Sequence, residues 1–365
     1  MIEDLVISTP GRVCLFGEHQ DYLGLPVIPA AISLRMIMRA TRRGDDNITI
    51  QLSDVQRSES FSLRGSLSYT TSNDYFRSGL NVLRRHGFTF STGLDCRVTS
   101  EIPINAGTSS SSALVVGWVN VLARMSDQRI HLHPSEMARY AFEAEVLEFN
   151  EAGGMMDQYS TAHGGVIVLD FVPDFRCEPM RVDLGAFVLG DSGRPKDTQH
   201  ILLRVKNGVQ NIVTRLLAKQ PSFSIMDLTA ETVMQYKNEL TAEQFSLLEG
   251  TIRNHEITKE ARRLLSVKPL NHKCIGQLLT KHHAVLRDVQ RISTPKIDRM
   301  IDAALAAGAY GGKINGSGGG GCMFAYAPEN AEKVAEAIER AGGQAHIVYV
   351  DVGSRDDTKN VQLSG

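Results

Sequence analysis

Short stretches in the first half of the chain place apolar side chains at every second position, whereas others repeat them every third or fourth position. The first spacing is typical of a β-strand with one buried face, and the second is typical of a helix with one buried face. The alternating stretches are residues 33–41, 48–52 and 93–100. The helical stretches are residues 74–86, 113–125 and 134–148. This mixture predicts an α+β domain.

A polar, turn-rich stretch near residues 172–179 separates this region from a second one. Just before it, the apolar run 166–169 predicts a buried strand. After it, strands are predicted over 186–189, 323–326 and 345–350, and helices over 295–307 and 329–341. We therefore expect two domains, residues 1–178 and residues 179–365.

The composition excludes several classes of protein. The 365 residues carry 39 basic and 41 acidic side chains, a net charge of −2, which gives no electrostatic basis for binding nucleic acid or an anionic membrane. The five cysteines are widely spread without a CxxC pair, so neither a disulfide framework nor a structural zinc site is indicated. No apolar run is long enough for a membrane span, and the acidic N-terminus is unlike a signal peptide. We expect a soluble cytoplasmic protein.

The first candidate site is a turn at the end of an apolar strand. Residues 13–16 are mostly apolar, and Glu18, His19 and Asp21 follow within five positions. Three such side chains on one turn can direct several hydrogen bonds at a polyhydroxylated ligand. A charged surface turn would have the same sequence, and Arg12 at the other end of the strand could face solvent or the same cleft.

The second candidate site is a run of four serines, residues 109–112, directly before an apolar helix. The free N–H groups and the positive dipole at a helix N-terminus favour an anion such as a phosphate. Hydroxyl groups can also join the oxygen ligands of Mg²⁺. The segment is not a Walker A loop, because the pattern GxxxxGK[ST] is absent from the sequence. The alternative interpretation is a serine-capped helix after a flexible loop.

Two further segments complete the candidate chemistry. Residues 316–321 are glycine at all positions except Ser317, which predicts a loop with positive φ values pressed against a ligand or against another loop. Glu145 and Asp157 lie in or near a Gly- and Met-rich setting, where a partly desolvated carboxylate needs a basic partner or a metal ion. A helix N-cap is the simpler interpretation of Asp157.

In their order and spacing, these four segments resemble the motifs of the GHMP small-molecule kinases, which include galactokinase, homoserine kinase and mevalonate kinase. Residues 11–22 and 154–158 resemble galactokinase segments, residues 103–111 the phosphate loop of the family, and residues 313–322 its third motif. The resemblance spans nearly the whole chain. It implies an N-terminal α+β domain, a C-terminal ferredoxin-like α+β domain, and ATP with Mg²⁺ in the cleft between them.

The resemblance also implies roles for individual residues. Asp157 matches the aspartate beside the acceptor hydroxyl, and Arg12 matches its basic neighbour. Ser111 and Glu145 match the residues that hold the metal ion, with Ser110 as the alternative to Ser111. The residues matched to sugar contacts are Glu18, His19, Asp21 and Gly154. The residues matched to ATP contacts are Gly107, Thr108, Ser109, Ser110, Ser111, Ser112 and Phe76.

The reaction implied is transfer of the ATP γ-phosphoryl group to a sugar hydroxyl, with the C1 hydroxyl of galactose or a related sugar as the first expectation. A mevalonate kinase is the alternative, because the segment 190–198 is more similar to those enzymes. A sugar-sensing regulator on the same scaffold would bind without turnover. A dinucleotide oxidoreductase is excluded, since no GxGxxG follows a predicted strand. We expect a monomer or a weak homo-oligomer.

Overall fold

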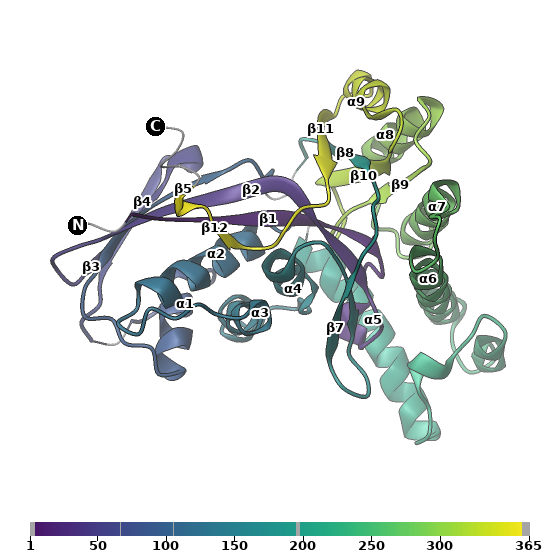
Figure 1. Ribbon diagram of the computed structural model, residues 1–365. Coiled ribbons are helices and arrows are strands. Elements are labelled where there is room, and N and C mark those ends of the chain that lie inside the picture. Colours follow the sequence, from purple (N-terminus) through teal and green to yellow (C-terminus); the bar gives the residue numbers. More distant parts are fainter. Residues whose placement is uncertain (1–3, 66, 105, 195–197, 360–365) are drawn as a thin grey trace.

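The computed structural model of the protein describes residues 4–65, 67–104, 106–194 and 198–359. Figure 1 shows a large sheet built mainly from the N-terminal half, in purple and blue, and a smaller sheet from the C-terminal half. Helices pack beside both sheets. The predicted α+β architecture is therefore confirmed.

The larger sheet has eight strands in the described residues, ordered β12-β1-β2-β5-β3-β4, with β6 pairing with β2 and with β7. They are β1 (Asp4–Phe16), β2 (Ile28–Arg42), β3 (Asn47–Leu52), β4 (Arg57–Ser62), β5 (Leu94–Ser100), β6 (Val166–Asp170), β7 (Arg176–Met180) and β12 (Arg355–Asp356). Paired strands run antiparallel except β3 and β5, which are parallel. Two short 3₁₀ helices follow β1 and β3, namely η1 (Asp21–Leu23) and η2 (Ser53–Val55).

One face of this sheet is covered by helices (Figure 1). They are α1 (Tyr75–Arg85), α2 (Ser110–Met125), α3 (Pro134–Phe142) and α4 (Met156–His163). The helix α2 contacts the strands β1 and β2 as well as the helices α1, α3 and α4, so its sequence is apolar on nearly every side. Its Trp118 is fully buried, and the indole N–H donates a hydrogen bond of 2.9 Å to the carbonyl oxygen of Phe76. This core fixes the N-terminus of α2.

The smaller sheet has the order β11-β8-β10-β9 and is antiparallel throughout. Its strands are β8 (Ala186–Asp191), β9 (Gly311–Ile314), β10 (Cys322–Tyr326) and β11 (Gln344–Tyr349). The helices α8 (Pro295–Ala306) and α9 (Ala331–Arg340) pack against it. Numbered within the domain this order is 4-1-3-2, which is the ferredoxin-like arrangement expected from the family resemblance.

A helical layer is inserted between β8 and α8 of the smaller domain. It consists of α5 (Thr198–Lys219), η4 (Ile225–Asp227), η5 (Thr232–Tyr236), α6 (Ala242–Leu265) and α7 (His272–Asp288). The helices α5, α6 and α7 also contact η1 and β1 of the larger domain. The layer therefore borders both parts of the molecule.

The boundary predicted after residue 178 falls inside β7, which pairs along its whole length with β6 of the larger sheet. The chain also returns to that sheet after β11, where Asp356 pairs with Ile7 of β1. The larger sheet therefore takes strands from both sides of the predicted division. In the described residues, no helix combines the length and the apolar composition that crossing a membrane requires.

Candidate active site

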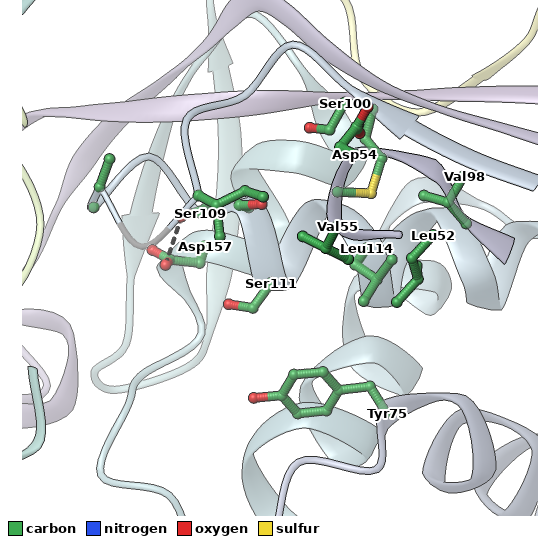
Figure 2. Close-up of a pocket in the computed structure, with 15 residues that line it drawn as sticks. Leu52, Asp54, Val55, Tyr75, Val98, Ser100, Ser109, Ser111, Leu114 and Asp157 are labelled. Atoms are coloured by element: carbon green, nitrogen blue, oxygen red, sulfur yellow. Dashed lines mark hydrogen bonds between the residues drawn. The ribbon is translucent and has the colours of Figure 1, made fainter. Parts of the chain in front are cut away.

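Two cavities meet in the larger domain, and one of them also borders the glycine-rich loop of the smaller domain. The apolar cavity is lined by Met36, Leu52, Val55, Val98 and Leu114 together with Ser109, Ser110 and Ser111, and Figure 2 shows these side chains. The acidic cavity is lined by the carboxylates of Glu18, Asp21, Glu145, Glu151 and Asp157. Tyr75, Ser111 and Asp157 line both cavities. A molecule in one cavity can therefore reach a molecule in the other beside Asp157.

The carboxylate of Asp157 is held by Arg12 through two hydrogen bonds. Arg12 Nε donates to Oδ1 at 2.8 Å and Nη2 donates to Oδ2 at 2.7 Å, in the bidentate geometry that arginine favours. Burial alone would lower the pKa of Arg12, but the charges of Asp157 and Glu18 raise it. Asp157 lies in the first turn of α4, yet its side chain does not cap the helix. The N-cap interpretation is therefore wrong, and the carboxylate faces the cavities.

The serine run lies at the N-terminus of α2, as predicted, but the individual serines make different contacts. Ser109, with a φ of 59°, makes no capping hydrogen bond and instead donates to Asp157 Oδ2 at 2.6 Å (dashed in Figure 2). Ser110 lines the apolar cavity, and Ser112 lines the acidic one. Thr108 was predicted to contact ATP, but it lines neither cavity: its side chain is buried, and its hydroxyl donates to the carbonyl oxygen of Pro103 at 3.4 Å.

Glu145 lies beside the serine run because the helix predicted over 134–148 changes its winding. The α-helix α3 ends at Phe142 and continues as one π-helical turn, η3 (Glu143–Leu147), a feature that often marks functional sites. Glu145 Oε2 accepts a hydrogen bond of 2.7 Å from Gln158 Nε2, and the side chains of Ser111 and Ser112 line the same cavity as this carboxylate. Burial and the nearby charge of Asp157 raise the pKa of Glu145.

This environment fits a divalent cation. Glu145 is a buried carboxylate, and the carboxylate of Asp157 lies near it. Among the described residues, Glu145 forms no ion pair with a basic side chain. The oxygen donors of Glu145 and Ser111 are of the type that Mg²⁺ prefers. No group of three or more His, Cys, Asp or Glu side chains in the described residues could hold a metal by itself. A cation here would therefore need phosphate or water oxygens as further ligands.

The turn after β1 is fixed by contacts to the smaller domain. Glu18 forms an ion pair of 2.7 Å with Lys313 of β9, and both side chains are almost completely buried. The imidazole of His19 lies between Tyr22 and Ser317: its Nδ1 is 2.7 Å from the Tyr22 hydroxyl, and its Nε2 donates to the carbonyl oxygen of Ser317 at 3.1 Å. Burial lowers the pKa of His19, so the ring is neutral at pH 7.

Asp21 and Gly154 line the acidic cavity side by side and pack directly against each other. Asp21 Oδ2 accepts a hydrogen bond of 3.4 Å from the backbone N–H of Met156, at the start of α4. Burial, together with the charge of Asp157, raises the pKa of Asp21 to about 6. A Cβ atom on Gly154 would lie only 2.0 Å from Asp21 Oδ2, so only glycine permits this approach.

We expect the substitution Gly154→Ala to weaken acceptor binding, because the added methyl group must displace the Asp21 carboxylate. A hydrogen bond to a charged group contributes about 1.5–3 kcal/mol, so the KM for the acceptor should rise at least about tenfold in steady-state assays. Gly153→Ala is the matched control, since a Cβ there would meet only Val146 Cγ2 at an ordinary 3.8 Å. Equal KM values for the two variants would contradict the role of Gly154.

The glycine-rich loop presses against the serine loop, which is one of the two outcomes predicted for it. Its glycines 316 and 318–321 all have positive φ values. A Cβ on Gly316 would lie 2.8 Å from the carbonyl oxygen of Gly107, and the Cys322 N–H donates to the carbonyl oxygen of Ala106 at 2.7 Å. Asn315 Nδ2 and Arg12 Nη1 also donate to the carbonyl oxygen of Gly107. The two loops thus fix each other.

The structure gives Phe76, which was predicted to contact ATP, no place in either cavity. Its ring is buried in the core in a perpendicular contact with Trp118. The preceding residue, Tyr75, lines both cavities instead. One residue is about 100° on a helix, so the step from Tyr75 to Phe76 turns the side chain from the cavity to the core.

Sequence reasoning also missed Gln158 and Lys313 as parts of the site. Both stand inside quoted motifs, but neither periodicity nor spacing indicated that Gln158 would hold Glu145 or that Lys313 would pair with Glu18. The other residues predicted for the site line one of the two cavities, as described above.

Comparison with known proteins identifies three family models along the chain. The GHMP kinases N terminal domain matches residues 74–165, GHMP kinases C terminal matches residues 262–344, and the galactokinase galactose-binding signature matches residues 2–42. The sequence is 27% identical to mevalonate kinase of Pyrococcus horikoshii, with 96% of both chains covered. It is 26% identical to galactokinase of Haemophilus influenzae, covering 97% of this chain and 94% of that one.

Two solved structures show the same fold. Galactokinase of Lactococcus lactis, complexed with galactose, superposes with a TM-score of 0.85 at 21% identity, covering 97% of this chain and 95% of that one. Mevalonate kinase of Methanococcus jannaschii superposes with a TM-score of 0.73 at 20% identity, covering 96% of this chain and 99% of that one. At these identities the structural similarity shows the fold and does not show which acceptor this protein uses.

Proposed function

Because the chain belongs to the GHMP kinase family, an ATP-dependent group of small-molecule kinases, we propose that it transfers the γ-phosphoryl group of ATP to a hydroxyl of a monosaccharide. The C1 hydroxyl of galactose or of a related sugar is the acceptor we propose. One observation carries this proposal: Asp157 lines both cavities, and Arg12 holds its carboxylate through two hydrogen bonds.

The arrangement supports a division of labour between the cavities. The apolar cavity suits a nucleotide base, and the serine run beside it offers hydroxyl groups and the N-terminus of α2 to phosphate oxygens. Ser111 and Glu145 would hold Mg²⁺, which when bound neutralises charge on the phosphates. Thr108 and Phe76 have no part in this proposal.

In the proposed reaction, Asp157 orients the acceptor hydroxyl and accepts its proton. The bidentate hydrogen bonds from Arg12 place a positive charge beside the carboxylate and fix its direction. Arg12 has a second role: its positive charge offsets the negative charge of the phosphoryl group as that group moves toward the acceptor. The hydroxyl of Ser109 restrains Asp157 Oδ2, which helps hold the carboxylate in one orientation.

The acidic cavity favours a neutral sugar over mevalonate. Its carboxylates can each accept hydrogen bonds from sugar hydroxyls, whereas the carboxylate of mevalonate would be repelled by Asp21 and Glu151. Arg12, the basic side chain that lines this cavity, is paired with Asp157. The two basic side chains that α5 brings nearby also donate elsewhere, Arg204 to the carbonyl oxygen of Gln290 and Lys206 to that of Ala152. Mevalonate kinase stays the second candidate because of the relatives described above; residues 195–197 of the segment 190–198 lie outside the described residues.

A coupled assay of ADP release tests the proposal. The acceptor panel contains galactose, other hexoses, arabinose, galactosamine and galacturonate, together with mevalonate and homoserine. We expect turnover with a monosaccharide and none with mevalonate. Turnover with mevalonate alone would replace the proposal by the second candidate. Binding of galactose without ADP release under any condition would indicate a sensor instead of an enzyme.

We expect the kcat/KM for the acceptor to fall as the pH drops below about 6. The raised pKa of Asp21, about 6, means that this carboxylate becomes protonated there and can no longer accept two hydrogen bonds from sugar hydroxyls. Since the pKa in the folded protein is above the unfolded value of 3.8, protonation of Asp21 stabilises the fold as the pH falls from 6 toward 4. A pH profile of wild type and Asp21→Asn checks this, because the acidic limb should disappear in the variant.

A further inference from the structure

The acidic cavity has two walls that come from different segments of the larger domain. One wall is the η1 turn with Asp21 and Tyr22. The other is the loop 151–155 between η3 and α4, which contributes Glu151, Gly153 and Gly154. The two walls touch where Gly154 packs against the Asp21 carboxylate, so a small movement of the loop would change the width of the cavity.

Lys206 of α5 contacts both walls from outside the larger domain. Its Nζ donates a hydrogen bond of 2.9 Å to the carbonyl oxygen of Ala152 in the loop. The same ammonium group lies 5.5 Å from the centre of the Tyr22 ring in the turn, within the range of a cation–π interaction. Figure 1 shows α5, in teal, beside the purple segment that follows β1, in agreement with the contacts between α5 and η1.

The choice of partners is unusual for a lysine. Within the described residues, Lys206 forms no ion pair with a carboxylate, although the acidic cavity is close by. Its ammonium group instead donates to a backbone carbonyl and faces an aromatic ring. Ordering a long lysine side chain costs conformational entropy, which the hydrogen bond to Ala152 and the contact with the Tyr22 ring must offset.

The turn is attached to the same helical layer a second time. The side chain of Gln20 is fully buried, and its amide oxygen accepts a hydrogen bond of 2.9 Å from the backbone N–H of His255 in α6 when its nitrogen donates to the carbonyl oxygen of Pro26. The turn is therefore fixed to α6, and Lys206 fixes the loop to α5. The helices α5 and α6 therefore hold both walls of the acidic cavity in place.

We propose that Lys206 is a positioning residue that holds the loop 151–155 against the η1 turn and so sets the width of the acidic cavity. The inference rests on the proposed function in one respect, because that function makes this cavity the acceptor site. Lys206 does not line the cavity, so it acts on the acceptor through the loop and not by direct contact.

The substitution Lys206→Met tests this, since methionine keeps the length and apolar stem of the side chain and removes the donor and the charge. We expect the KM for galactose to rise about tenfold, which corresponds to about 1.4 kcal/mol, while the KM for ATP changes by less than about twofold. Lys206→Arg retains a donor and a cation and should restore most of the affinity. Lys219→Met is the matched control on the same helix, where Lys219 pairs only with the exposed Glu239.

An unchanged KM for galactose in Lys206→Met would overturn the inference, as would an equal rise in the KM values for galactose and ATP. Thermal unfolding of each variant separates a local change from general destabilisation. A tenfold rise in KM at an unchanged Tm would show that the substitution alters the cavity and not the stability of the whole fold. If wild type phosphorylates mevalonate and no sugar, the proposed function fails, and the same comparison made with mevalonate still decides the role of Lys206.

Discussion

The variant Asp157→Asn is expected to lose at least about 100-fold in kcat, the range typical of removing a general base. The amide keeps the shape of the side chain and can still accept one hydrogen bond from Arg12, but it cannot take up the proton of the acceptor hydroxyl. Because Asp157 is proposed to act on the reaction step, the dissociation constant of galactose should change little. Single-turnover assays of phosphoryl transfer and calorimetric titration with galactose measure the two quantities separately.

Asp95→Asn is a suitable control, since Asp95 accepts a hydrogen bond from Arg43 on the surface and lines neither of the two cavities of the candidate site. It should retain wild-type kcat. Near-normal turnover in Asp157→Asn would remove this residue from the mechanism and leave only a structural role for its pair with Arg12.

The variant Glu18→Gln is expected to lower the free energy of unfolding by about 3–5 kcal/mol, as found when one partner of a buried ion pair is removed. Lys313 is completely buried, and in the variant its ammonium faces neutral groups, namely the new amide oxygen at position 18, the carbonyl oxygen of Cys14 and the ring of Phe324, in place of the Glu18 carboxylate. The uncompensated charge then destabilises the junction between β1 and β9. Urea denaturation measures the effect.

The double variant Glu18→Gln/Lys313→Met should recover part of this loss, because it removes both charges from the interior. Glu336→Gln makes the same chemical change in an exposed pair with Arg340 and should cost about 0–1 kcal/mol. Equal losses in Glu18→Gln and Glu336→Gln would show that burial gives the Glu18–Lys313 pair no special weight.

The pattern of apolar positions predicted most of the regular elements correctly and missed details that depend on neighbours. The stretch 134–148 has a helical period, and no local signal distinguishes the π turn that brings Glu145 toward Gln158. Likewise, the family resemblance implied an ATP contact for Phe76, but the side chain of Phe76 packs in the core and that of its neighbour Tyr75 lines the cavity. The first difference is in the winding of one helical turn, and the second is in the direction of one side chain.

The sequence by itself determined the chemical inventory of this protein: two α+β domains, a serine run at a helix N-terminus, a glycine-rich loop and a small set of carboxylates. These are local properties, because they depend on residue type, short-range spacing and backbone freedom. The tertiary structure alone decided which groups meet. Arg12 reaches Asp157 across 145 positions, Glu18 reaches Lys313 across 295, and Lys206 reaches Ala152 across 54. Such pairings follow from how strands and helices pack around a shared core, and no pattern within one segment contains that information.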